Sequence, residues 1–325
     1  MPPQQPIPPH LTGRPFRLAE ALDAGLSVTM LRGQRFRQLR QGVYAEAAIA
    51  DDLETRVDAA RLVLPDSAVL SHATAAQLRG LPVPGTQLLH VTLPPDVERT
   101  RAAGVCCHQR EVRTESYKGR LVSVPTDNFL ELAETLSLVD LVVLGDAMVR
   151  RGLVTATGLR EEVAATQRRR CVRLARRAAG LVRPGVDSPQ ETRARLLILL
   201  AGLPEPEPNF VVHDAAGGWI GPVDLAYPAL RIAIEYHGDV HRRKRGRWRS
   251  DIAKAELLRE IGWTVVLTAS DLDDRPERTL NRVRGALVDA GHPTVPAEFD
   301  QAWRNHLMPR WAADRMEWAR ADRAS

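Results

Sequence analysis

Two acidic residues stand out in an apolar stretch of this 325-residue chain. Asp224 and Glu235 are the acids of VDLAYPALRIAIEYHG. Side chains alternate along a strand, and a turn near Pro228 would bring the two carboxylates to one face of a sheet. Buried carboxylates repel each other, and a cation between them relieves that repulsion. The spacing therefore predicts a Mg²⁺ or Mn²⁺ site held by Asp224 and Glu235, with an ion pair to Arg231 or Arg193 as the structural alternative.

Such a cation would perform phosphodiester chemistry. It polarises a phosphate oxygen and lowers the pKa of a bound water, which attacks phosphorus in line. His237 shares the face of Glu235 and His241 follows it, so either imidazole could position that water or relay its proton. Lys254 would offset anionic charge in the transition state. A cation site of this kind is thus expected to support hydrolysis of a phosphodiester.

A strongly basic segment follows these acids. Residues 242–249 contain no acid, and its basic and aromatic members are Arg242, Arg243, Lys244, Arg245, Arg247, Trp248 and Arg249. A loop of this composition beside the acids can bind DNA phosphates and make binding depend on salt. A solvated loop is the alternative.

The elements that position these residues follow from cap and turn signals. Ser188 and Pro189 are a cap and first-turn pair, and they predict a helix that runs through LLILLAG. The pattern further predicts strands at 209–213, 219–226 and 230–236, a helix at about 250–261, a strand at 263–268 and a helix at 276–290. The resulting order is α-β-β-β-α-β-α, an α/β (α+β) fold with a mixed sheet flanked by helices.

The N-terminal region has the outline of a winged helix-turn-helix. Short helices are expected at 16–22 and 27–32, the second capped by Ser27, and residues 36–40 lead into Gly42. Arg32 and Arg35 would lie beside the recognition element and bind DNA. The alternative is a three-helix packing module with exposed arginines.

The expected organisation is a disordered N-terminus (1–13), a winged-helix domain (14–152), a basic helical linker (153–187), a nuclease-like domain (188–292) and a C-terminal helix (293–325). In that last helix Trp303, Trp311 and Trp318 recur about every two turns and are expected to pack on the body of the protein or on another subunit.

Composition agrees with a nucleic-acid partner. The chain has 45 basic and 40 acidic side chains, a net charge of +5 and a pI near 9.5. Three sparse cysteines favour a reducing cytoplasm, and no stretch has the roughly 18 apolar residues that a membrane helix needs. Zinc is not expected at Cys106, Cys107 and His108, because adjacent cysteines lack the usual Cys-x2-Cys spacing. His72 and His90 are interpreted as ordinary core or surface histidines.

Residues 188–290 resemble the PD-(D/E)XK nuclease superfamily, in its Vsr-like (very-short-patch-repair-like) endonuclease branch. The stretches that carry the likeness are SPQETRARLLILL, VDLAYPALRIAIEYHGDVHR and WRSDIAKAELLREIGWTVVLT. The resemblance implies a restriction-endonuclease-like fold in which Asp224 and Glu235 bind the metal and Glu191 assists them. It also implies that His241 and Asp251 lie near the active centre.

The chain departs from this family at two positions. His237 stands where the superfamily has a lysine, and Lys254 stands where the branch has an arginine. The alternative function is therefore a non-catalytic DNA-binding regulator that uses a degenerate nuclease fold.

The first 150 residues or so, with SHATAAQLRGLP and LLHVTLP, resemble AbiEi-like abortive-infection antitoxins. This implies DNA binding by the winged helix, in repair, phage defence or mobile-element biology. The alternative partners are a toxin–antitoxin partner protein or a second copy of the chain in a homodimer.

Overall fold

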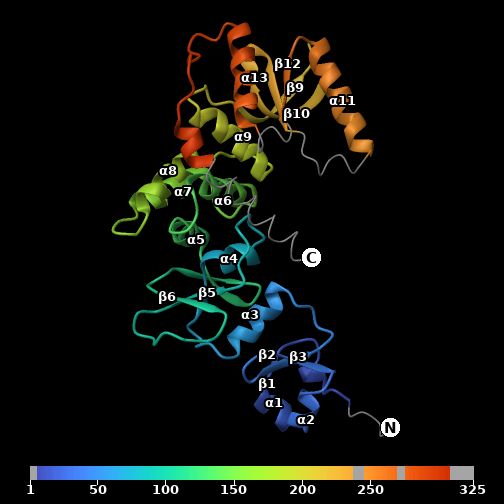
Figure 1. Ribbon diagram of the computed structural model, residues 1–325, viewed down its shortest axis with the longest axis vertical. Coiled ribbons are helices and arrows are strands. Elements are labelled where there is room, and N and C mark those ends of the chain that lie inside the picture. The colour runs from blue at the N-terminus through green and yellow to red at the C-terminus, as the bar shows by residue number, and fades with distance from the viewer. Residues whose placement is uncertain (1–5, 237–244, 269–274, 308–325) are drawn as a thin grey trace. The chain divides into compact units, whose positions relative to one another are not determined.

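The structure is a computed structural model that describes residues 6–236, 245–268 and 275–307, without the side chains of 245–252 and 267–268. The chain divides into two compact units, Met1–Leu132 and Ala133–Ser325. Each combines helices with β-sheet (Figure 1), so the predicted mixed α/β class is confirmed. Across the described ranges, every helix is too short or too polar to span a bilayer.

The first unit begins with a small sheet of order β1-β3-β2. Its elements are β1 (Phe16–Arg17), α1 (Leu18–Asp23), α2 (Val28–Leu31), β2 (Phe36–Arg40) and β3 (Val43–Glu46). The helix expected from residue 16 begins two residues later, because Phe16 and Arg17 pair with β3 instead. Ser27 caps α2 as predicted, since its Oγ accepts the Met30 N–H at 3.2 Å.

A five-stranded mixed sheet completes the first unit, in the order β6-β5-β4-β8-β7. Its strands are β4 (Val69–Leu70), β5 (Leu89–Leu93), β6 (Val105–Gln109), β7 (Thr114–Tyr117) and β8 (Arg120–Ser123), and its helices are α3 (Leu53–Arg61), α4 (His72–Leu78) and α5 (Pro125–Leu132). β5 and β6 are parallel, whereas β4 and β5 are antiparallel. Val57, Leu70 and Val91 belong to the core of this unit.

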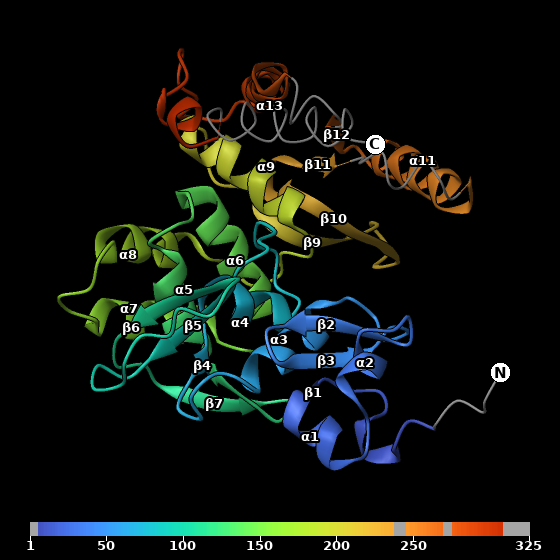
Figure 2. The same ribbon diagram turned by 60° about the horizontal axis from the view of Figure 1, so that its bottom comes forward.

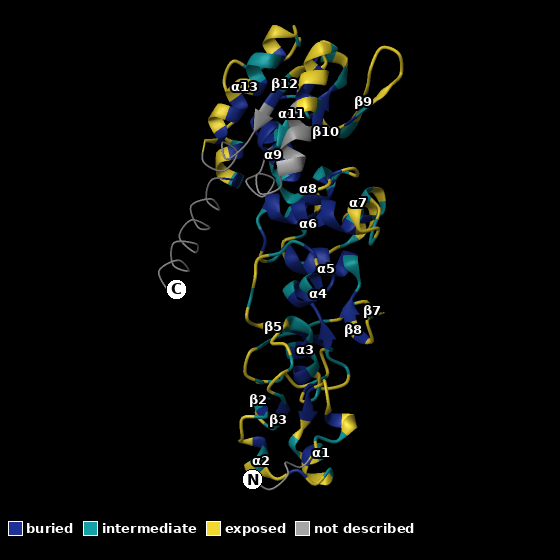
Figure 3. Ribbon diagram, turned by 90° about the vertical axis from the view of Figure 1, so that its right-hand side faces the viewer, coloured by how far each residue is buried: buried dark blue, intermediate teal, exposed yellow. Residues whose placement is uncertain are grey.

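The second unit opens with four helices: α6 (Leu138–Arg150), α7 (Ala156–Ala165), α8 (Val172–Leu181) and α9 (Pro189–Leu200). Almost all of α6 is buried, as its dark colour in Figure 3 shows. The sequence pattern predicts a domain boundary at residue 152, whereas the contacts within the structure divide the chain after Leu132. The reason is that α6 is joined to α9, where Asp146 and Arg195 form an ion pair of 3.1 Å.

A four-stranded sheet of order β12-β11-β10-β9 forms the rest of the second unit. Its elements are β9 (Glu207–His213), β10 (Trp219–Tyr227), β11 (Ile232–Tyr236), α11 (Arg245–Glu260), β12 (Thr264–Thr268) and α13 (Pro276–Asp289). β9, β10 and β11 are antiparallel, and β12 joins β11 in parallel. The sheet lies between α11 and α13 in Figure 1, and α9 runs beside β10 and β11 in Figure 2.

The basic segment differs from the sequence-based expectation. α11 begins at Arg245 and not near residue 250, so Arg245, Arg247, Trp248 and Arg249 belong to a helix. Arginine favours helix, and the single Gly246 costs only about 1 kcal/mol. Arg242, Arg243 and Lys244 lie outside the described residues.

The C-terminal segment packs on the body through one of the predicted tryptophans. Trp303 is 2% exposed, as expected for a packing residue. Trp311 and Trp318 lie outside the described residues.

Candidate functional site

The two acids that the sequence singles out lie on neighbouring antiparallel strands. Leu225 of β10 pairs with Ile234 of β11, and extending this register by one pair sets Asp224 opposite Glu235. Residues opposite each other across two strands share a face. The turn predicted at Pro228 is a short 3-10 helix (Pro228–Leu230) followed by Arg231 with φ of 52°.

Each of the two carboxylates has a partner within the protein. An Asp224 oxygen accepts the N–H of Tyr236 at 2.6 Å, and a Glu235 oxygen lies 2.5 Å from the Lys254 ammonium of α11. Lys254 also donates to the carbonyl of Pro222 at 2.5 Å. The Lys254 ammonium is therefore held beside the paired acids, with the Glu235 side chain 13% exposed.

One of the two arginines that the sequence offered as alternative ion-pair partners, Arg193, has another partner. Arg193 pairs with Asp140 at 2.9 Å. The cation that neutralises Glu235 comes instead from Lys254 of α11. Lys254 stands at the position where the Vsr-like branch has an arginine.

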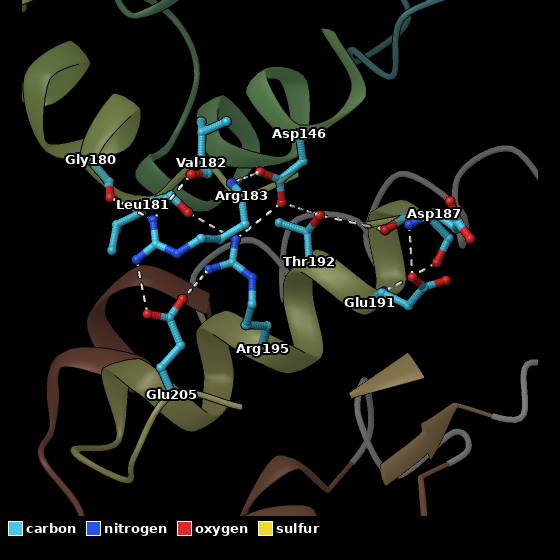
Figure 4. Close-up of polar contacts among 11 residues, drawn as sticks. Asp146, Gly180, Leu181, Val182, Arg183, Asp187, Glu191, Thr192, Arg195 and Glu205 are labelled. Carbon is cyan, nitrogen blue, oxygen red and sulfur yellow. Dashed lines mark hydrogen bonds and ion pairs between the residues drawn. The ribbon is translucent and has the colours of Figure 1, made fainter. Parts of the chain in front are cut away.

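Glu191 combines a helix-capping role with electrostatic contact to Asp224. Its N–H donates to Ser188 Oγ at 3.2 Å, and its carboxylate accepts the N–H of Asp187 at 2.8 Å (Figure 4). Burial raises the pKa of Glu191 above its usual value, and the negative charges of Asp224 and Asp187 raise it further. Glu191 and Asp224 therefore interact electrostatically.

The three acids are not arranged around one preformed point. Of the described His, Cys, Asp and Glu residues, the one group of three whose ligand atoms all lie within 4.8 Å of one another is His90, Cys106 and His108. Direct binding of one ion by Glu191, Asp224 and Glu235 together would therefore require side-chain movement. Two acids with a neighbouring lysine are the arrangement that the structure provides.

Several predicted residues cannot be placed at this site. His237 and His241 lie outside the described residues, and Asp251 belongs to α11 at a position whose side chain is not described. In the first unit, Arg32 is the exposed C-cap of α2. The Arg35 guanidinium lies 5.8 Å above the ring of Phe36.

The sequence-based reasoning missed a cluster of histidines and a cysteine in the first unit. His90 of β5 pairs with Cys106 of β6, and His108 lies two residues further along β6. The rings of His72 and His108 stack with centroids 3.6 Å apart. Alternation along VCCHQ is the signal that could have revealed it, because Cys106 and His108 share a face while Cys107 packs against the hydrophobic core. His72 is 2% exposed, as expected for a core histidine.

Comparisons with known proteins place the chain among mycobacterial relatives. No family model matches it. The crystal structure of the RV2827C protein from Mycobacterium tuberculosis matches 62% of this chain and 83% of its own chain, with a TM-score of 0.39 and 14% identity. Two M. tuberculosis proteins, "Uncharacterized protein MT2308" of strain CDC 1551 and "Uncharacterized protein Rv2248" of strain H37Rv, are each 30% identical over 244 residues, 74% of this chain and 89% of each relative. The chain belongs to the family of these two proteins.

Proposed function

We propose that the second unit is a divalent-cation-dependent DNA endonuclease whose metal, Mg²⁺ or Mn²⁺, is bound by Asp224 and Glu235. The observation that carries the proposal is the strand register, which, extended by one pair, sets these two acids opposite each other among the buried apolar residues of β10 and β11. Oxygen ligands of this kind suit both ions. The order of elements from α9 to α13 supports a restriction-endonuclease-like core.

Glu191 adds a third acid near the paired acids, and Lys254 adds a positive charge beside them. Glu191 lies within electrostatic reach of Asp224, and a cation bound there would lower the cost of ionising all three acids. Lys254 holds a positive charge against Glu235. In this proposal the lysine from α11 takes over the charge that the superfamily places two residues after the second acid, where this chain has His237.

The chemistry follows from these charges. The bound cation would polarise the scissile phosphate and activate a water for in-line attack. Lys254 would stabilise the extra negative charge that develops on the phosphate oxygens. His237 and His241 follow Glu235 in the chain and stay the candidates for handling the proton of the attacking water. The basic residues at the start of α11 would bind flanking phosphates.

Cleavage of supercoiled plasmid with Mg²⁺ or Mn²⁺ tests the proposal. Asp224→Asn and Glu235→Gln keep the side-chain shape and remove one negative charge each. We expect either to slow nicking by at least about 100-fold, because a metal ligand supports several kcal/mol of transition-state stabilisation and 1.36 kcal/mol is a factor of ten.

Glu207→Gln is the matched control, since Glu207 is an exposed acid on β9 of the same sheet. It should nick at the rate of the unmodified protein. Nicking that persists in Asp224→Asn and Glu235→Gln, or that survives a chelator, would contradict the proposal.

A second candidate function is a DNA-binding regulator without catalysis. The observation that favours it is that both acids have protein partners, Asp224 with the Tyr236 N–H and Glu235 with Lys254. An arrangement of this kind is stable without a metal. No nicking by the unmodified protein, together with salt-sensitive binding to duplex DNA, would support this second function.

A further inference from the structure

We propose that His90, Cys106 and His108 form a zinc site on the sheet of the first unit, with three protein ligands and one open position. Their ligand atoms all lie within 4.8 Å of one another. The site lies in a different unit from Asp224 and Glu235 and is independent of the proposed nuclease function.

Strand geometry places the three ligands on one face. β5 and β6 are parallel, with His90 paired to Cys106 and Thr92 paired to His108. Residues two apart on a strand share a face, so Cys106 and His108 lie on the same side as His90. Cys107 lies between them in sequence and packs into the hydrophobic core on the other side. The adjacent cysteines are therefore not equivalent, and one of them is available as a ligand.

The distances between ligand atoms fit a tetrahedral ion. Zn–N bonds of about 2.0–2.1 Å and Zn–S bonds of about 2.3 Å at tetrahedral angles put two nitrogens about 3.3 Å apart and nitrogen and sulfur about 3.6 Å apart. His90 Nδ1 lies 3.1 Å from His108 Nε2, and Cys106 Sγ lies 3.6 Å from the same nitrogen. Two of the three pairs thus already have nearly the spacing that a bound ion requires, and the third, His90 with Cys106, lies within 4.8 Å.

A buried polar network fixes the backbone beside these side chains. The ring of His72 stacks on that of His108 at 12° between planes. A carboxylate oxygen of Glu131, which is fully buried, accepts the N–H of His72 at 2.9 Å and the hydroxyl of Ser123 at 3.0 Å. The N–H of His90 donates to Thr74 Oγ1 at 2.7 Å. These amide contacts fix the backbone at His72 and His90, and the stacked ring of His72 limits the movement of the His108 ring.

The donor set decides which ion is expected. Two imidazoles and one thiolate are borderline-soft ligands that suit Zn²⁺ and are poor ligands for Mg²⁺. Binding requires the Cys106 thiol to lose its proton, so metal uptake should release protons. Three protein ligands leave a fourth tetrahedral position for water, as in zinc sites that are not closed.

Cobalt substitution tests the site. The full-length protein is stripped with a chelator and titrated with Co²⁺, whose tetrahedral complexes with a thiolate show both visible d–d bands and a sulfur-to-cobalt charge-transfer band in the near ultraviolet. We expect one equivalent of Co²⁺ to give the charge-transfer band and Zn²⁺ to abolish it by displacement. Cobalt at Asp224 and Glu235 has oxygen ligands and cannot produce that band.

Matched cysteine variants identify the ligand. Cys106→Ala should lose the charge-transfer band, whereas Cys107→Ala and Cys171→Ala should retain it. His90→Ala should weaken Zn²⁺ binding by about 100-fold or more, since even residues behind the ligands change affinity by 10- to 100-fold. Circular dichroism of each variant verifies that it is folded.

Three results would overturn the proposal. They are the absence of a charge-transfer band in the folded, unmodified protein, its persistence in Cys106→Ala, and its loss in folded Cys107→Ala. The last result would mean that the cysteine facing the core is the ligand.

Discussion

The chemistry of single residues in this protein depends on which neighbour each charge acquires. Glu235 would be costly in an apolar strand, and the ammonium of Lys254 at 2.5 Å compensates it. Asp224 is stabilised differently, by a backbone N–H from Tyr236 at 2.6 Å. Lys254 therefore has two effects on the proposed metal site: it competes with a cation for Glu235, and it contributes positive charge where a phosphate would bind.

These two effects can be separated with Lys254→Gln. Removing the positive charge should tighten Mn²⁺ binding several-fold, because two like charges no longer share Glu235. The same change should slow plasmid nicking by about tenfold or more, since the transition state loses a cationic partner. Manganese affinity by calorimetry and nicking rates at saturating metal measure the two effects.

Lys118→Gln is the control, because Lys118 is an exposed lysine that pairs with Glu54 in the first unit. It should change neither quantity. Weaker Mn²⁺ binding in Lys254→Gln would show that Lys254 supports the metal site and does not compete with it.

At the scale of elements, one buried arginine joins the helices of the second unit. Arg195 of α9 is fully buried and donates to Asp146 of α6 at 3.1 Å, to Glu205 at 2.7 Å and to the carbonyl of Leu181 at 2.9 Å (Figure 4). Asp146 also accepts the N–H of Arg183 at 2.8 Å. Burial raises the pKa of Asp146, and the charge of Arg195 opposes that rise. The network therefore joins α6, the end of α8 and α9 through hydrogen bonds and ion pairs, and so fixes the position of α9 relative to the other two helices.

Arg195→Met tests how much this junction contributes. It leaves Asp146 as a buried charge without its cation, which costs about 3–5 kcal/mol of unfolding free energy. Chemical denaturation should show that loss. In the double variant with Asp146→Asn, the two effects should fall short of additivity by about 1–3 kcal/mol, because the same ion pair is removed twice. Additive losses would mean that the two residues stabilise the unit independently.

At the scale of the whole molecule, the two units offer different surroundings for ions. The first places nitrogen and sulfur ligands on one sheet face, and the second places carboxylates at neighbouring strand positions. Soft and hard ligands of these kinds select different metals. The net charge of +5 further favours a polyanionic partner.

If that partner is DNA, binding should weaken steeply with salt. Each neutralised phosphate contributes a slope of about 0.9 to the logarithm of affinity against the logarithm of salt concentration for duplex DNA. Fluorescence anisotropy with a labelled duplex at several salt concentrations gives the slope. Asp224→Asn should keep the same slope, since it alters the metal site and not the cationic surface. A slope near zero in the unmodified protein would contradict a phosphate-binding role.

Local elements could be predicted because their causes are local. Ser188 with Pro189 begins α9, Ser27 caps α2, and the turn at Pro228 separates β10 from β11, as the sequence indicates. The start of α11 could not be placed in the same way. Its basic residues are good helix formers and extend the helix back to Arg245, through the single Gly246.

The sequence by itself determined the strands that carry Asp224 and Glu235, because period-two alternation and turn residues act over a few positions. Tertiary structure alone decided that Lys254 pairs with Glu235 and that α6 packs with α9. It also decided that His90 meets Cys106 and His108. Each of these contacts joins segments distant in the chain, and their register is fixed by packing of the whole unit, which no local pattern encodes.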